Sequence, residues 1–160
     1  MAGKKLTHVD AKGRPRMVDV TAKGDTVRIA IAKGLVRMQP ATFKLIQGGG
    51  ITKGDVLTTA QLSGIMGAKK TPDIIPLCHP ILISNVAIEF TPDVKTSTIG
   101  ITATVESTGK TGVEMEALTA VSITALTIYD MCKAVDRGMK IENIRLVKKS
   151  GGKSGTIELE

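Results

Sequence analysis

Aromatic side chains are nearly absent from this chain of 160 residues, which has no Trp, one Tyr and two Phe. The hydrophobic core must therefore be built from Ile, Val, Leu, Met and Ala. Modules that bind single-stranded nucleic acid stack the bases on exposed aromatic side chains. With so few aromatics available, we expect no nucleic acid partner of that kind.

Cysteines are also scarce, since Cys78 and Cys132 are the only two and lie far apart in the sequence. There is no Cys-x-x-Cys motif and no disulfide framework, which favours a reducing cytoplasm. No apolar run reaches membrane-spanning length, and the N-terminus lacks the apolar stretch of a signal peptide. We expect a cytoplasmic protein with no membrane partner.

Charge is unbalanced but spread along the chain. Lys and Arg number 22 against 15 Asp and Glu, a net charge of +7, with no run of five basic residues. This excess predicts an anionic partner, for which nucleic acid, nucleotide and phosphorylated metabolite all qualify. The length and the 42% apolar content predict one folded domain over residues 1–160, with residues 1–15 loose.

Hydrophobic periodicity predicts an alternation of strands and helices. Strands are expected at 17–20, 26–38 with a break near Gly34, 81–90, 98–107, 141–148 and 156–159. Helices are expected at 41–47, from a cap at Asp55 to about residue 70, and at 114–137, with Gly64 and Gly67 marking a close helix contact. This order predicts an α+β fold, with helices on one face of a sheet and a βαββαβ arrangement in the C-terminal two-thirds.

Two glycine loops contain a Gly-Lys-Thr/Ser sequence, at 109–111 and at 152–154. A phosphate-binding P-loop also needs a glycine five positions before its Gly-Lys, and here those positions hold Thr104 and Val147. Neither loop is therefore a P-loop. Backbone amides beside a lysine still favour anions, while the alternative for each loop is a turn with a solvated lysine.

The expected helix at 114–137 has polar residues at both ends of an uncharged run from Ala117 to Tyr129. Asp130 and Lys133 form an i,i+3 pair, which is either an exposed ion pair or an acid and base in a cleft. Glu116 lies fourteen residues before Asp130, nearly in phase but about 20 Å away by helical rise. A compact site using both ends would need a neighbouring element or subunit.

Three further residues are candidates for chemistry. His79 lies between two prolines and next to Cys78, so it is either a ligand-binding or proton-transferring group or a structural histidine. No second ligand has a spacing typical of a metal site, and we expect neither metal nor cofactor. Lys53 follows three glycines and is a catalytic lysine or a surface charge. His8 has no assignment, and the residues alone indicate a cytosolic enzyme or binder of a phosphorylated ligand.

Several motifs together resemble the MoaC family of molybdenum cofactor biosynthesis. They are Met17-Val18-Asp19-Val20, Lys53-Gly54-Asp55-Val56, Ile75-Pro76-Leu77-Cys78-His79-Pro80, the segment from Thr108 to Ala120, Tyr129-Asp130-Met131-Cys132-Lys133-Ala134, and Lys149-Ser150-Gly151-Gly152-Lys153-Ser154-Gly155. The resemblance covers residues 7–156, and the motifs occur in the family's order. It implies a ferredoxin-like subunit in a homo-oligomer, a hexamer built as a trimer of dimers, with each site at a subunit boundary.

The resemblance also implies a lyase-type reaction, in which (8S)-3′,8-cyclo-7,8-dihydroguanosine 5′-triphosphate becomes cyclic pyranopterin monophosphate and pyrophosphate. It gives Asp130, Lys133 and Lys53 catalytic roles. It assigns substrate contacts to Leu77, Cys78, His79, Glu114, Met115, Glu116, Lys149, Lys153 and Arg28. We further expect Lys53 or Lys133 to act with a lowered pKa, because basic groups cluster there. The competing hypothesis is a non-catalytic binder of a nucleotide or phosphorylated ligand.

Overall fold

The computed structural model describes residues 9–10 and 12–160. Its elements follow in the order β1 (Thr26–Arg37), α1 (Pro40–Gln47), α2 (Val56–Lys69), α3 (Thr71–Ile74), β2 (Ile83–Asp93), β3 (Thr98–Gly109), α4 (Glu114–Cys132), β4 (Lys140–Ser150) and β5 (Ile157–Glu158). Among these residues, no helix is both long enough and apolar enough to cross a lipid bilayer.

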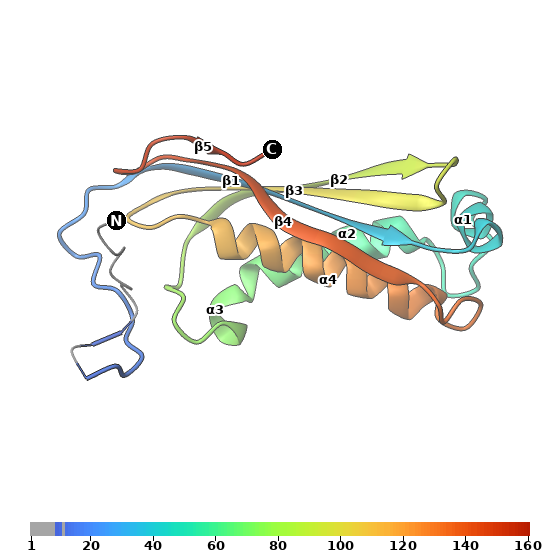
Figure 1. Ribbon diagram of the computed structural model, residues 1–160, viewed down its shortest axis with the longest axis horizontal. Coiled ribbons are helices and arrows are strands. Elements are labelled where there is room, and N and C mark those ends of the chain that lie inside the picture. The colour runs from blue at the N-terminus through green and yellow to red at the C-terminus, as the bar shows by residue number, and fades with distance from the viewer. Residues whose placement is uncertain (1–8, 11) are drawn as a thin grey trace.

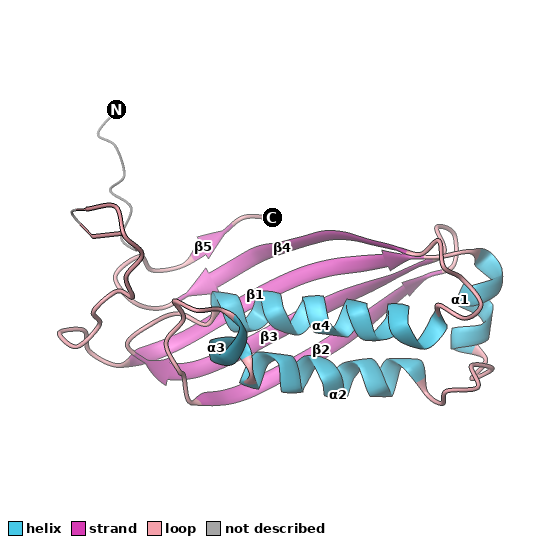
Figure 2. Ribbon diagram, turned by 90° about the horizontal axis from the view of Figure 1, so that it is seen from below, coloured by secondary structure: helices cyan, strands magenta, loops and turns pink. Residues whose placement is uncertain are grey.

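The strands form one antiparallel sheet in the order β2-β3-β1-β4-β5. The long helices α2 and α4 lie side by side on one face of this sheet (Figures 1 and 2). The first four strands in space are therefore those of a βαββαβ unit with ferredoxin-like order, and β5 is added at the edge beside β4. This confirms the α+β fold predicted from the sequence.

Helices α2 and α4 approach closely at two glycines of α2. A Cβ atom on Gly64 would overlap Thr124 of α4 and Ile88 of β2, and one on Gly67 would lie 2.8 Å from Ile123. Asp55 caps α2, its carboxylate accepting from the amide of Thr58 at 3.0 Å. The sequence predicted both the cap and the close contact, and both are confirmed.

The expected break in the first strand is absent, because β1 runs without interruption through Gly34. The irregularity falls instead in the pairing with β4, where the register shifts between Lys33 and Leu35. Glycine is needed at position 34 for packing, since a Cβ there would lie 2.8 Å from Val121 of α4 and 3.1 Å from Ile144 of β4.

Helix α4 ends at Cys132, five residues before the predicted end at 137. The next turn folds back, with the amides of Val135 and Asp136 both donating to the carbonyl of Cys132. The Asp136 carboxylate then accepts from the amide of Gln39 at 2.8 Å, just before α1. The helix ends here because the buried Asp136 carboxylate accepts a hydrogen bond at the start of α1.

The short strand expected at 17–20 is also absent. The Asp19 carboxylate accepts from the amide of Thr21 at 2.9 Å, and Lys23 bonds back to the carbonyl of Val20 at 3.0 Å. These local bonds make turns rather than a strand. Of the segment predicted to be loose, residues 1–8 and 11 lie outside the described residues, and Val9 forms an isolated bridge with Pro15.

Candidate active site

Arg28 lies near the start of β1, where antiparallel pairing places the end of β4 beside it. It is buried, and its Nε donates to the carbonyl of Gly109 at 3.1 Å. After β4 the chain turns at Gly151 and Gly152, whose φ angles are 97° and 72°. A Cβ on Gly152 would collide with the guanidinium, so this loop can lie against Arg28 only with glycine.

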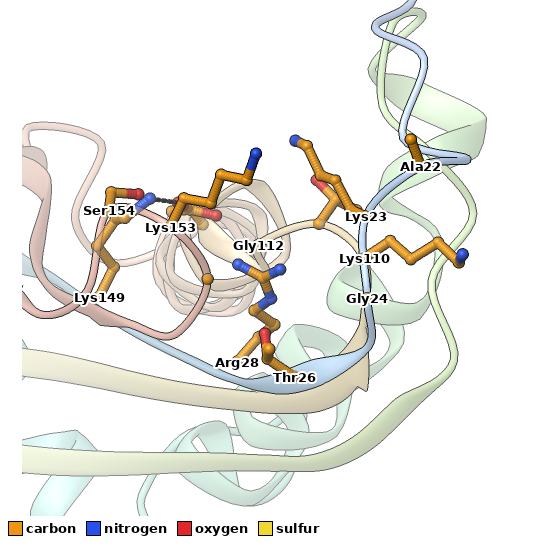
Figure 3. Close-up of a pocket in the computed structure, with 13 residues that line it drawn as sticks. Ala22, Lys23, Gly24, Thr26, Arg28, Lys110, Gly112, Lys149, Lys153 and Ser154 are labelled. Atoms are coloured by element: carbon orange, nitrogen blue, oxygen red, sulfur yellow. Dashed lines mark hydrogen bonds and ion pairs between the residues drawn. The ribbon is translucent and has the colours of Figure 1, made fainter.

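A pocket of about 560 Å³ opens above this contact and is called the basic pocket here. Its lining residues are Ala22, Lys23, Gly24, Thr26, Arg28, Lys110, Thr111, Gly112, Glu114, Lys149, Gly152, Lys153 and Ser154. The charged ends of Arg28, Lys23 and Lys153 point toward the same opening (Figure 3). Five cationic side chains against one carboxylate make this pocket suited to a polyanion such as a triphosphate.

Lys149 is turned within the pocket toward Glu114, with 2.6 Å between Nζ and Oε1. Glu114 is the first residue of α4, and Lys149 is near the end of β4. The ion pair therefore connects the start of α4 to the end of β4, and Glu114 offsets part of the positive charge.

A second pocket, of about 270 Å³, adjoins the first and is called the carboxyl pocket here. It is lined by Leu77, Cys78, His79, Ile81, Thr111, Gly112, Glu114, Met115 and Glu116. The loop after α3 supplies one wall and the first turn of α4 supplies the other. The two pockets share Thr111, Gly112 and Glu114, so one ligand with a charged part and a ring can occupy both.

Glu116 is the carboxyl group of this second pocket and is only 2% exposed. Its Oε1 has no hydrogen-bond partner among the described residues. Burial raises the pKa of Glu116 to about 7, the charge of Glu114 adds to the rise, and a backbone amide opposes it. Burial and Glu116 together raise the pKa of the Cys78 thiol as well, so Cys78 is not an activated nucleophile.

The segment before β1 belongs to the same site, which the sequence did not indicate. His79 Nε2 lies 2.7 Å from the carbonyl oxygen of Val18, and Lys110 Nζ donates to the carbonyl of Thr21 at 3.0 Å. Lys23 lines the basic pocket and carried no motif that could have identified it. Lys110 could have been found, because it lies in the first of the two glycine loops.

Lys53, Asp130 and Lys133 form a third group, the Asp130 cluster. Lys53 Nζ lies 3.0 Å from the carbonyl oxygen of Asp130 and 3.2 Å from its carboxylate, and Lys133 Nζ lies 2.7 Å from the other carboxylate oxygen. The sequence left open an exposed ion pair or an acid and base in a cleft at this end of α4, and the Asp130 side chain is 58% exposed in the single chain.

The two lysines act on the titration of Asp130, and Asp130 acts on theirs. Hydrogen bonds and charge from Lys133 first, and from Lys53 second, hold the pKa of Asp130 below its usual range. In return, Asp130 raises the pKa of Lys133. The expectation of a lowered pKa is therefore wrong for Lys133 in this structure, because a carboxylate and not another cation is its nearest charge.

The structure thus brings together two of the three groups within one chain. The predicted substrate contacts Arg28, Lys149, Lys153, Glu114, Leu77, Cys78, His79, Met115 and Glu116 line the two adjoining pockets. The Asp130 cluster lines neither of them. It lies at the other end of α4, about 20 Å from Glu116 by helical rise.

Comparison with known proteins identifies the family to which this chain belongs. The family model described as the MoaC family matches residues 17–152. The chain belongs to the MoaC family. The match includes eleven of the twelve candidate site residues, all except Lys153, and it also includes Val18, Thr21 and Lys23.

Curated members of the MoaC family are similar along nearly their whole length. A cyclic pyranopterin monophosphate synthase of Roseiflexus sp. (strain RS-1) is 63% identical over 150 residues, covering 94% of this chain and 95% of the relative. Proteins of that name from Rhodospirillum rubrum and Parvibaculum lavamentivorans are 60% and 61% identical, covering 94% and 97% of this chain and 91% and 97% of the relatives.

No group of three or more His, Cys, Asp or Glu placed to hold a metal ion occurs among the residues that the structure describes.

Proposed function

We propose that this protein is a cyclic pyranopterin monophosphate synthase, which converts (8S)-3′,8-cyclo-7,8-dihydroguanosine 5′-triphosphate to cyclic pyranopterin monophosphate and pyrophosphate. The observation that carries the proposal is the pair of adjoining pockets. The basic pocket is suited to a triphosphate, and the carboxyl pocket beside it is suited to a polar ring. The family membership and the shared name of the relatives support the same reaction.

The proposed roles of the residues follow from their charges. Arg28, Lys149 and Lys153 bind the triphosphate and stabilise the charge that develops when pyrophosphate leaves. Leu77, Cys78, His79, Met115 and Glu116 hold the base, with Glu114 between the two parts. Opening the purine ring and closing the pterin ring need several proton transfers, for which Asp130, Lys133 and Lys53 are the acids and bases.

A second copy of the chain would complete the site. Along its outer side, α4 presents an uncharged stripe of Met115, Leu118, Ser122, Leu126 and Tyr129. Two α4 helices packed antiparallel along this stripe would bring the acidic first turn of one beside the Asp130 cluster of the other. The dipoles of the two helices would then be antiparallel, which is favourable. This arrangement fits a cytoplasmic homo-oligomer, a hexamer built as a trimer of dimers.

The proposal is tested by turnover. The wild-type protein should release pyrophosphate from the cyclic triphosphate, and Asp130→Ala should lower kcat by about 10²–10⁴-fold, as expected for loss of an acid–base group. Asp73→Ala is the matched control, because Asp73 is also an exposed aspartate paired with a lysine three residues away. Binding of the nucleotide without pyrophosphate release by the wild type would instead support a non-catalytic binder.

A further inference from the structure

Glu116 is a buried carboxyl group without a cation of its own. Lys149 contacts the first turn of α4, but its ammonium is held by Glu114 at 2.6 Å. Glu116 Oε1 is buried at the wall of the carboxyl pocket and has no hydrogen-bond partner in the described part of the chain. A buried polar atom without a partner is costly unless a ligand supplies one.

Within one chain, the other walls of the pocket do not supply a positive charge. The Asp130 cluster that a second copy would bring beside the first turn of α4 has both of its lysines paired with Asp130. The titratable groups that line the carboxyl pocket are Cys78 and His79, from the loop after α3, and Glu114, from α4 itself. His79 Nε2 is already engaged with the Val18 carbonyl. The loop between β3 and α4 contributes the uncharged Thr111 and Gly112, and β1, β3, β4 and α2 contribute no residue to this lining.

We propose that Glu116 recognises the substrate as a neutral carboxylic acid, which pairs with a lactam, a ring carbonyl next to a ring N–H. The neutral acid donates its O–H to the lactam carbonyl and accepts the N–H with its other oxygen. An ionised carboxylate has only acceptors and would instead pair with two adjacent N–H groups, such as the N1–H and 2-amino group of guanine. The inference rests on the proposed function, because it assumes that a guanine-derived ring occupies the carboxyl pocket.

Burial explains why the neutral form is available. The pKa of Glu116 is raised to about 7, so the neutral form is well populated below neutral pH. If only this form binds, the dissociation constant should rise about tenfold between pH 6 and pH 8, as the neutral fraction falls from about nine-tenths to one-tenth.

The experiment compares Glu116→Gln with Glu116→Ala and the wild type, using GTP as a stable probe with the same lactam and triphosphate. Glutamine keeps one donor and one acceptor and cannot ionise. We measure dissociation constants calorimetrically from pH 6 to pH 8. All other pH-dependent groups are the same in the three proteins, so the ratio of the wild-type dissociation constant to that of E116Q isolates Glu116.

The inference is supported if the dissociation constant of the wild type is close to that of E116Q at pH 6 and exceeds it about tenfold at pH 8. The inference is overturned if the ratio of these two constants does not change with pH, or if E116Q binds GTP at pH 6 as weakly as E116A. Failure of the proposed function looks different, since the wild type would then release no pyrophosphate from the cyclic triphosphate, whatever the GTP ratio.

A second measurement needs no variant and applies even if E116Q does not fold. Inosine triphosphate has the lactam of GTP but lacks the 2-amino group. A neutral Glu116 should bind the two nucleotides within about threefold of each other at pH 6, whereas a carboxylate that uses the amino group should lose more than about tenfold with inosine triphosphate. The second result would overturn the inference.

Discussion

At the scale of single residues, the two ends of α4 hold carboxyl groups in opposite environments. Asp130 is exposed and has an ammonium group on each side, which lower its pKa. Glu116 is buried beside another carboxylate and has its pKa raised to about 7. Near neutral pH, Asp130 is therefore ionised while Glu116 exchanges a proton readily. Carboxyl groups with separated pKa values can take different roles in one reaction.

Glu116 should also make the stability of the protein depend on pH. Its pKa is raised on folding from 4.5 to about 7, so the unfolded state loses its proton first and stability falls as the pH rises from 4.5 to 7. Glutamine cannot ionise, so Glu116→Gln removes this fall in stability. The free energy of unfolding of E116Q should match the wild type near pH 4 and exceed it by up to about 3 kcal/mol above pH 7.

Urea denaturation of both proteins at several pH values measures this difference. Glu114→Gln is a useful comparison, because Glu114 is paired with Lys149 and its replacement should not produce the same gain above pH 7. An E116Q protein less stable than the wild type at pH 8 would contradict a neutral, buried Glu116.

The sequence singled out candidate site residues, but it did not indicate their burial or their pKa values. Resemblance to the family singled out Glu116 and Lys133, because a motif can be read from the order of residues alone. The burial of Glu116 and the contact of Lys53 with Asp130 depend on distances between segments far apart in the chain, since Lys53 and Asp130 are seventy-seven residues apart. No pattern in the sequence alone gives those distances.

At the scale of elements, the site depends on how closely α2 and α4 pack. Gly64 faces Thr124 and Ile88 so closely that a Cβ would overlap both, and it would lie 3.0 Å from the carbonyl oxygen of Ala120. Gly64→Ala should therefore destabilise the protein by about 1–3 kcal/mol or more, although alanine favours helices. The change is measured by urea denaturation.

Gly24→Ala is the control for that substitution, because nothing lies within 4 Å of the added Cβ and the backbone there is not in the left-handed region. It should change stability by less than about 0.5 kcal/mol. Equal effects of the two substitutions would show that the helix contact is looser than the structure indicates.

Elements with strong local patterns were predicted from the sequence, and those ended by distant contacts were not. The start of α2 at Asp55 and the strand that becomes β3 follow from local capping and alternation. The end of α4 does not, because Asp136 stops the helix by binding the amide of Gln39, ninety-seven residues away. The strand expected at 17–20 is absent for a local reason, because the Asp19 carboxylate accepts a hydrogen bond from the nearby amide of Thr21.

At the scale of the whole molecule, the sheet order explains why the basic pocket exists. Arg28 and Lys149 are distant in sequence but meet because β1 and β4 are neighbours in the sheet. The sheet does not bring the Asp130 cluster to the same place, because α4 runs along the sheet (Figure 1), with Glu114 at its start and Asp130 near its end. A complete site in this form requires a second copy of the chain.

Mixed oligomers test that requirement. Glu116→Ala and Asp130→Ala should each be inactive alone. When the two are refolded together in equal amounts, half the dimers are mixed and each mixed dimer has one intact site, so about a quarter of wild-type activity should return. Turnover is measured by pyrophosphate release at matched protein concentration.

Asp130→Ala mixed with Lys53→Ala is the control, because both residues belong to the Asp130 cluster of one chain. That mixture should stay inactive. If the E116A and D130A mixture also stays inactive although an affinity tag on one variant co-purifies the other, the site is not shared across an α4–α4 contact in the way proposed.

The uncharged interior of α4 also sets a limit on how this protein can change in length. Each residue inserted between Glu116 and Asp130 would turn one end of the helix by about 100° relative to the other and lengthen it by about 1.5 Å. One inserted residue would therefore move Asp130 out of line with Glu116. Loops in this fold can vary in length, but the proposed shared site requires a constant number of residues in α4 between Glu116 and Asp130.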